Sequence, residues 1–112
     1  MIRQPDFVNA EIFEQAKAAV AKKKPHIDLS IARLEQFTEG LCAQVIHIGS
    51  YNDEPEIVAE LERFVKSQGH EFDVETNVHT MSRCHHEIYL SDPRKTAADK
   101  LKTIIRYPIR KV

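Results

Sequence analysis

The chain has 112 residues, of which 42% are hydrophobic and 29% are charged, and its formal net charge is −1. This size predicts one small domain over residues 1–112 with a modest core. A charge so close to neutral argues against direct binding to nucleic acid or to a membrane, and no apolar run approaches the roughly 20 residues of a membrane span. The first residues lack the apolar stretch of a signal peptide, so we expect a cytoplasmic protein. There Cys42 and Cys84 are expected to be thiols, with a bridged pair as the alternative.

Hydrophobic periodicity and turn residues divide the chain into alternating strands and helices. In chain order, the expected elements are a strand or extended lead-in at 2–8, a helix at 10–24, a loop at 26–32, strands at 33–37 and 41–48, a helix between Asp53 and Gly69, a short strand near 72–74, a strand at 85–90, a turn at 91–93, a loop or helical turn at 94–100 and a strand at 101–110. This order predicts an α+β fold, a two-layer sandwich whose mostly antiparallel sheet has two helices on one face.

A few positions set the expected boundaries. Asn9 is the predicted N-cap of the first helix, and Asp53 and Glu56 have the spacing of a capping box at the start of the second. Gly69 suits the position just after that helix ends. Pro108 has no backbone N–H, so it predicts that the final strand ends at an edge or a bend of the sheet. The basic residues around it fit a solvated edge strand better than a nucleic-acid surface.

The main functional candidate is Glu87, because it lies in the middle of a short apolar strand. Alternation places it on one face of that strand with His85 and Tyr89. A carboxylate there is costly unless it is solvated, paired or used for function. In the functional interpretation it faces a hollow as a cation partner or a general base, and Tyr89 adds a hydroxyl and an aromatic wall. In the structural interpretation it lies at the rim or pairs with one of three arginines: Arg83, Arg94 or Arg106.

The remaining polar features have less specific patterns. Tyr51, just before the second helix, covers either the mouth of a pocket or the apolar face of the helix. His47 is more typical of a hydrogen-bonded core residue than of a ligand contact. The sequence has no phosphate loop and no dinucleotide fingerprint, so no cofactor is expected. The candidates for a metal site are His79, Cys84, His85 and His86. No metal site is expected, because adjacent strand residues such as His85 and His86 point to opposite faces and cannot both bind one ion.

Three segments of the chain together resemble the GyrI-like small-molecule-binding proteins. Residues 34–55 are similar to the central strand and turn of that family. Residues 85–96, which contain the motif EIYLSDP, and residues 100–108 resemble its C-terminal hairpin. Residues 1–8 look like an internal segment of its stand-alone members.

The resemblance implies a fold, a ligand class and a set of site residues. Family members pair two βαββ modules about a pseudo-two-fold axis and bind small hydrophobic or cationic molecules in a cleft between them. Some stand-alone members hydrolyse strained cyclopropane-bearing toxins. The key glutamate of the family maps onto Glu87, which with Tyr89 would be catalytic in a hydrolase. The expected ligand-binding residues are Glu87, Tyr51, Tyr89, His47 and His85.

The chain departs from the family in length, because it resembles only the later part of a typical member. We therefore expect the first module to be lacking, one side of the cleft to be open, and a second copy of the chain to close it in a homodimer. Three functions follow as hypotheses: a small-molecule binder or sensor, a hydrolase that uses Glu87, and a protein-interaction inhibitor of a DNA-processing enzyme.

Overall fold

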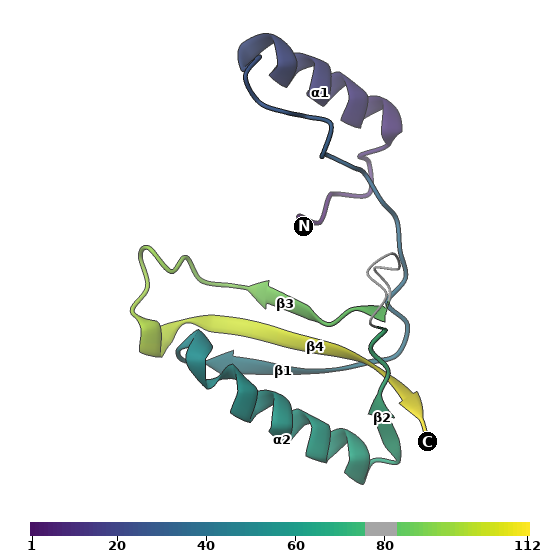
Figure 1. Cartoon of the computed structure of the whole chain (residues 1–112), viewed down its shortest axis with the longest axis vertical. Helices are drawn as coiled ribbons and strands as arrows, with labels where there is room; N and C mark the ends of the chain where they lie inside the picture. The colour runs from purple at the N-terminus through teal and green to yellow at the C-terminus, as the bar shows by residue number, and fades with distance from the viewer. Residues whose placement is uncertain (76–82) are drawn as a thin grey trace. The chain divides into compact units, whose positions relative to one another are not determined.

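A computed structural model describes residues 1–75 and 83–112 of the chain. It has two compact units, Met1–Gln36 and Phe37–Val112, which Figure 1 draws. The elements are α1 (Ala10–Lys23), β1 (Cys42–Ile48), a 3-10 turn (Tyr51–Asp53), α2 (Glu54–Ser67), β2 (His70–Phe72), β3 (His86–Tyr89), a second 3-10 turn (Ala98–Lys100) and β4 (Lys102–Lys111). The expected α+β class, with an antiparallel sheet and two helices, is confirmed. Neither of the described helices has the length and hydropathy of a membrane span.

The first unit contains helix α1 and no strand. The predicted cap is confirmed, because the Asn9 side chain accepts a hydrogen bond of 2.9 Å from the backbone N–H of Ile12. The helix ends at Lys23, one residue before the predicted end. The strands predicted at 2–8 and 33–37 are wrong, although the extended lead-in remains as the alternative for 2–8. A strand requires a partner for its backbone groups, and neither segment has a strand beside it among the described residues.

The sheet of the second unit is built around β4. Strand β1 pairs antiparallel along one side of β4, while β2 and β3 both pair antiparallel along the other side. The chain therefore runs β1–α2–β2/β3–β4, which is a βαββ arrangement with a broken outer strand. The predicted edge position of the last strand is wrong, because β4 is the central strand.

Pro108 is tolerated in this central strand because of where the outer strand breaks. β2 ends opposite Ile109 and β3 begins opposite Arg106, so Pro108 lies at the gap between them. Its carbonyl accepts a hydrogen bond of 2.9 Å from Asp73, and no ladder bond from its own nitrogen is needed at the gap. The sequence rule that assigns proline to an edge assumes a continuous neighbouring strand.

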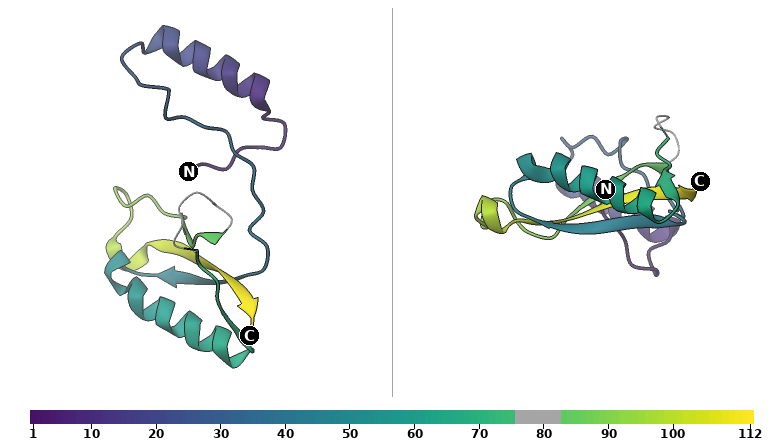
Figure 2. Two further views of the ribbon diagram at one scale, coloured as in Figure 1. Left: turned by 45° about the vertical axis from the view of Figure 1, so that its right-hand side comes forward. Right: turned by 90° about the horizontal axis from the view of Figure 1, so that it is seen from below.

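Helix α2 packs along one face of the sheet against β1 and β2 (Figure 2). Its buried residues are Leu61 and Val65, and Ile105 and Thr103 of β4 are buried as well. Gly69 adopts a positive φ of 74° after the helix, as its position predicted. The predicted capping box is wrong, because the Asp53 side chain makes no cap hydrogen bond.

The turn from β1 into α2 replaces that capping box. Gly49 has a φ of 144°, a conformation that favours glycine. Ser50 then accepts a hydrogen bond from the backbone N–H of Asn52 and caps the 3-10 turn that precedes the helix. The chain thus enters α2 through a tight turn, which brings Tyr51 and Glu54 close to the end of β1.

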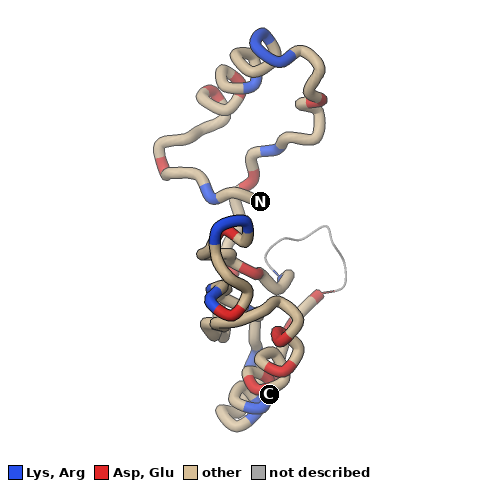
Figure 3. Tube along the Cα trace, turned by 90° about the vertical axis from the view of Figure 1, so that its left-hand side faces the viewer, with Lys and Arg blue, Asp and Glu red and all other residues tan. Residues whose placement is uncertain are grey.

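The opposite face of the sheet is partly apolar and partly ionic. Ile46, Ile48 and Leu90 are exposed by 54%, 59% and 54%. Farther along this face, Glu39 binds both His86 at 2.9 Å and Arg106 at 2.8 Å. Acidic and basic residues are otherwise interspersed along both units (Figure 3).

Candidate functional site

Strand register brings Glu87 and Tyr89 to the face of the sheet that α2 covers. Glu87 lies opposite Ile105 and Tyr89 lies opposite Thr103, and paired residues point to the same face. On the other side of β4, His47 pairs with Thr103. The predicted alternation of β3 is therefore confirmed, and the candidates from two strands share one surface.

The centre of the site is a short hydrogen bond between the two β3 residues. The Tyr89 hydroxyl donates to Oε2 of Glu87 over 2.6 Å. This bond to the carboxylate is the main cause that raises the pKa of Tyr89 to about 12. The phenol therefore keeps its proton at neutral pH and remains a hydrogen-bond donor.

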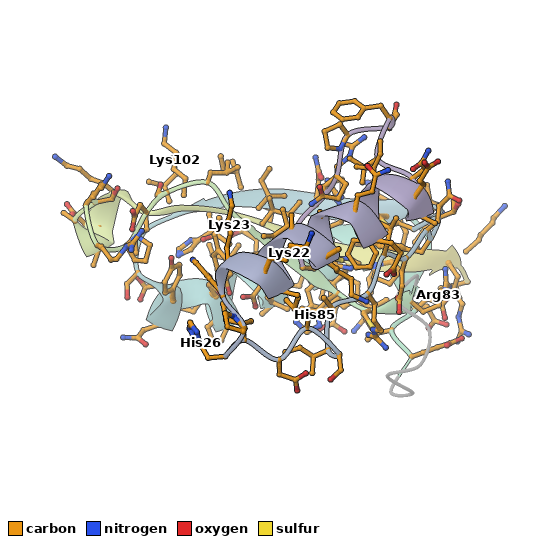
Figure 4. All side chains as sticks on the ribbon, turned by 90° about the horizontal axis from the view of Figure 1, so that it is seen from above. Lys22, Lys23, His26, Arg83, His85 and Lys102 are labelled. Carbon is orange, nitrogen blue, oxygen red and sulfur yellow. The ribbon has the colours of Figure 1, made fainter. Side chains whose placement is uncertain are left out.

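Aromatic rings surround this pair. Tyr51 meets Tyr89 edge-to-face with 5.5 Å between ring centroids. His85 stacks on Tyr107 at 5.0 Å, and its Nε2 lies 3.9 Å from Oε1 of Glu87. Phe72 stacks against the same Tyr107 ring at 4.4 Å. Figure 4 shows the side chains and labels His85. The carboxylate itself contacts Tyr89 and His85, and the ring contacts extend from these two residues to Tyr51, Tyr107 and Phe72.

His47 lies beneath this surface and is buried, with 5% exposure. Its Nε2 is 2.9 Å from the carbonyl oxygen of Ser50, so the ring braces the turn that carries Tyr51. The interpretation of His47 as a hydrogen-bonded core residue is confirmed. A role in ligand contact stays a prediction for this residue.

Sequence reasoning missed Glu54, in the first turn of α2. Oε1 of its carboxylate is buried and has no hydrogen-bond partner among the described residues. Burial, and then the negative charge of Glu87, raise the pKa of Glu54, while His47 acts in the opposite direction. An acidic residue in the first turn of a helix is already explained by the helix dipole, so the sequence does not indicate a functional role for Glu54.

The Glu87 carboxylate is only partly enclosed, with 32% of its side chain exposed. The pairing with an arginine that the structural interpretation offered is wrong for each candidate, because these arginines bind other carboxylates. Arg83 pairs with Asp73, Arg94 with Asp92 and Arg106 with Glu39. The surface therefore holds two carboxylates, Glu54 and Glu87, and the hydroxyls of three tyrosines. Among the described residues, none of the three candidate arginines pairs with Glu87 there.

Across residues 1–75 and 83–112, no group of three or more His, Cys, Asp or Glu side chains is arranged to hold a metal ion. His79, one of the candidates weighed for such a site, lies outside the described residues. Cys42 and Cys84 are thiols.

Comparison with known proteins places this chain in a family. The GyrI-like small molecule binding domain matches residues 4–110. Similar solved structures include an uncharacterized conserved protein from Listeria innocua, 45% identical, with a TM-score of 0.87 over 96% of this chain and 50% of that one. A hydrolase from Listeria innocua is 44% identical, with a TM-score of 0.84 over 96% of this chain and 52% of that one.

The match is extensive for this chain and partial for its relatives. The chain spans about half the length of the solved structures it matches. No curated protein matches it. Because the family match runs through nearly the whole sequence, the chain belongs to the GyrI-like small-molecule-binding domain family.

Proposed function

We propose that the chain binds small molecules that combine a positive charge with an apolar body, at the surface formed by Glu87, Tyr89 and Tyr51. The observation that carries this proposal is the Glu87 carboxylate, which accepts a hydrogen bond of 2.6 Å from the Tyr89 hydroxyl at Oε2. Membership of a small-molecule-binding family supports the same conclusion.

The chemistry of the surface favours this ligand class. A carboxylate attracts a cation, and tyrosine rings within about 6 Å of a cation add a favourable electrostatic contact. Tyr51 and Tyr89 are exposed by 38% and 58%, so both rings have area that a ligand would cover. His85 and Tyr107 extend the aromatic surface on the other side of Glu87.

The test is a calorimetric titration at pH 7 with (naphthylmethyl)trimethylammonium, using neutral naphthylmethanol for comparison. The cation should bind and the alcohol should bind more weakly. Glu87→Gln should lower the affinity for the cation by about twofold to fivefold, the effect of losing a partly exposed charge pair. Glu56→Gln, which removes an exposed carboxylate from the same end of α2, should leave it unchanged. Equal affinities for all three proteins would contradict the proposal.

A second candidate function is hydrolysis of a strained cyclopropane ring. A similar solved structure is that of a hydrolase, and Glu87 and Tyr89 supply a base and a protonated phenol side by side. Glu87 would take a proton from a water molecule while the oxygen of that water bonds to a ring carbon. The ring C–C bond would then break, and Tyr89 would protonate the carbon released. Turnover of a cyclopropane-bearing alkylator should be abolished by Glu87→Gln while binding persists. Unchanged turnover in that variant would contradict these roles.

We also propose that two copies of the chain associate as a homodimer. The apolar face that carries Ile46, Ile48 and Leu90 supports this, because exposed apolar patches mark association surfaces. This face lies opposite the one that carries Glu87, so a dimer formed through it would differ from the expected dimer in which the second copy closes the cleft. Light scattering after size exclusion should give twice the mass of the chain at micromolar concentration. The double variant Ile46→Lys, Ile48→Lys should give a monomer. A monomeric wild type would refute the dimer without affecting the ligand site.

A further inference from the structure

We infer that His85 makes the cation site sensitive to pH: the protonated ring pairs with Oε1 of Glu87 and competes with positively charged ligands, and the neutral ring lets them bind. The inference rests on the proposed function, because it describes how the same surface is regulated. It changes the expected role of His85 from a contact of the ligand to a competitor of the ligand.

The two oxygens of Glu87 have different neighbours. Oε2 accepts the 2.6 Å hydrogen bond from the Tyr89 hydroxyl. Oε1 lies 3.9 Å from Nε2 of His85, which is within reach of an ion pair but too long for a hydrogen bond. The side chains of His85 and Glu87 are 48% and 32% exposed, so solvent and ligands reach both. A cation that pairs with Oε1 therefore takes the position beside the imidazole.

Aromatic stacking keeps the imidazole beside Oε1. The His85 ring stacks on Tyr107 at 5.0 Å with 13° between the ring planes, and Phe72 stacks on the same Tyr107 ring at 4.4 Å. A side chain that packing already holds in place loses little conformational entropy when it forms an ion pair. His85 can therefore pair with Glu87 at a lower entropic cost than a long, free side chain.

The other cationic groups near this surface have different partners. Among the described histidines of the second unit, His47, His70 and His86 contact the Ser50 carbonyl, the Gln68 carbonyl and the Glu39 carboxylate. Arg83 and Arg110, on the β2 side of the stack, pair with Asp73 and Glu71. Of the described side chains, His85 is the one whose charge forms an ion pair with Glu87 when it is protonated.

The acidic and phenolic groups of the surface do not replace His85 in this role. Those that face it or act on the same charges are Glu87, Tyr107, Tyr89, Tyr51 and Glu54. Phenols ordinarily keep their protons up to about pH 10, and glutamates ordinarily lose theirs near pH 4.3. Glu54 is the exception to be controlled, because burial raises its pKa and the loss of its charge would also weaken cation binding.

The direction of the effect follows from the charge of the ring. An imidazole ordinarily changes its charge between pH 5 and 8. When His85 is protonated, it attracts the Glu87 carboxylate and repels a second cation; when it is neutral, it does neither. Cation binding should therefore weaken as the pH falls. By linkage, a bound cation should in turn make His85 harder to protonate, so binding should release protons in this pH range.

The experiment uses (naphthylmethyl)trimethylammonium, whose own charge does not depend on pH. It is titrated by calorimetry at about pH 5.5 and about pH 8, which span the range where imidazoles titrate. The wild type should bind about twofold to fivefold more weakly at the lower pH, the effect of one partly exposed ion pair. His85→Phe keeps a ring to stack on Tyr107 but cannot be protonated, so its affinities at the two pH values should be nearly equal. Comparing the two pH values within each protein removes any change in aromatic contact.

Two control variants and a second readout make the assignment specific. His70→Phe, the same substitution at a histidine of β2, should keep the pH dependence of the wild type. Glu54→Gln should keep most of it. Wild-type titrations at intermediate pH in two buffers of different ionisation enthalpy should show proton release on binding, and His85→Phe should show none. Circular dichroism at both pH values establishes that each variant is folded, and His85→Gln takes the place of His85→Phe if that variant does not fold.

The outcomes separate this inference from the proposed function. If the probe does not bind the wild type at either pH, the proposed function fails and the inference fails with it. If the wild type binds equally well at both, the surface binds cations without regulation by His85, and only the inference fails. A pH dependence that persists without the histidine, or that disappears in Glu54→Gln, assigns the effect to another group and also overturns the inference.

Discussion

Removing the hydroxyl of Tyr89 tests the contact at the centre of the site. Tyr89→Phe deletes the donor of the 2.6 Å hydrogen bond to Glu87 and leaves the ring, with its edge-to-face contact to Tyr51. We expect this change to lower the free energy of unfolding modestly. We also expect it to lose its effect when Glu87 is already replaced by Gln, because the two side chains act through each other.

The magnitude follows from the perturbed titration of the phenol. Raising the pKa of Tyr89 from 10.0 to about 12 nominally corresponds to almost 3 kcal/mol, at about 1.4 kcal/mol for each pH unit. Tyr89 is 58% exposed, so solvent screening reduces the contribution to about 0.5–1 kcal/mol. The folded pKa lies above the unfolded one, so this stability is fully present below pH 10 and is lost as the pH rises towards 12.

Urea unfolding of the wild type, Tyr89→Phe, Glu87→Gln and the double variant measures this coupling at pH 7. The cycle should give an interaction energy of about 0.5–1 kcal/mol. The same cycle with Tyr51→Phe should give a value near zero, because that hydroxyl belongs to the neighbouring ring. A coupling near zero for the Tyr89 cycle would refute the view that the bond organises the site.

Three further changes have defined outcomes. Thr103→Val should stabilise the protein by about 1 kcal/mol in urea unfolding, because its buried hydroxyl has no partner among the described residues; a loss of stability would contradict this. Gly49→Ala should destabilise it by about 1–3 kcal/mol, because the backbone has a φ of 144° and a Cβ would meet the His47 ring at 3.3 Å; an unchanged melting temperature would refute that strain. The raised pKa of Glu54 means that the folded state holds this proton more tightly, so stability should fall as the pH rises from 4.5 through that pKa, and Glu54→Gln should flatten the fall. An equal pH dependence in Glu54→Gln would assign the effect to other groups.

Sequence patterns were sufficient to predict the elements that are determined by residues close together in the chain. The branched residues of 41–48 and the glycine after them predicted β1 to within one residue. Alternation in 85–90 placed Glu87 and Tyr89 on one face, and the hydrogen bond between them confirms it. The α+β class followed from the same patterns, because amphipathic helices and half-buried strands leave few ways to cover their apolar faces.

The failures concern features that depend on distant parts of the chain. Residues 33–37 have a strand-like pattern, but a strand also requires a neighbour, which a local pattern does not report. The central position of β4 depends on the interruption opposite Pro108, which becomes visible only in the register. Glu54 was missed because an acidic residue in a first helical turn is ordinary. Only the packing of α2 on the sheet shows that one of its oxygens is buried.

The broken outer strand gives this domain room to diversify. Because β2 and β3 align separately against β4, the segment that joins them can differ in length among related domains while both ladders are kept. The Tyr107 ring, held between Phe72 and His85, joins the two flanks of that segment. Related domains should therefore vary most in length at this position, immediately beside Glu87, while β1 and β4 keep theirs. Evolution could in this way exchange one ligand preference for another and leave the framework intact.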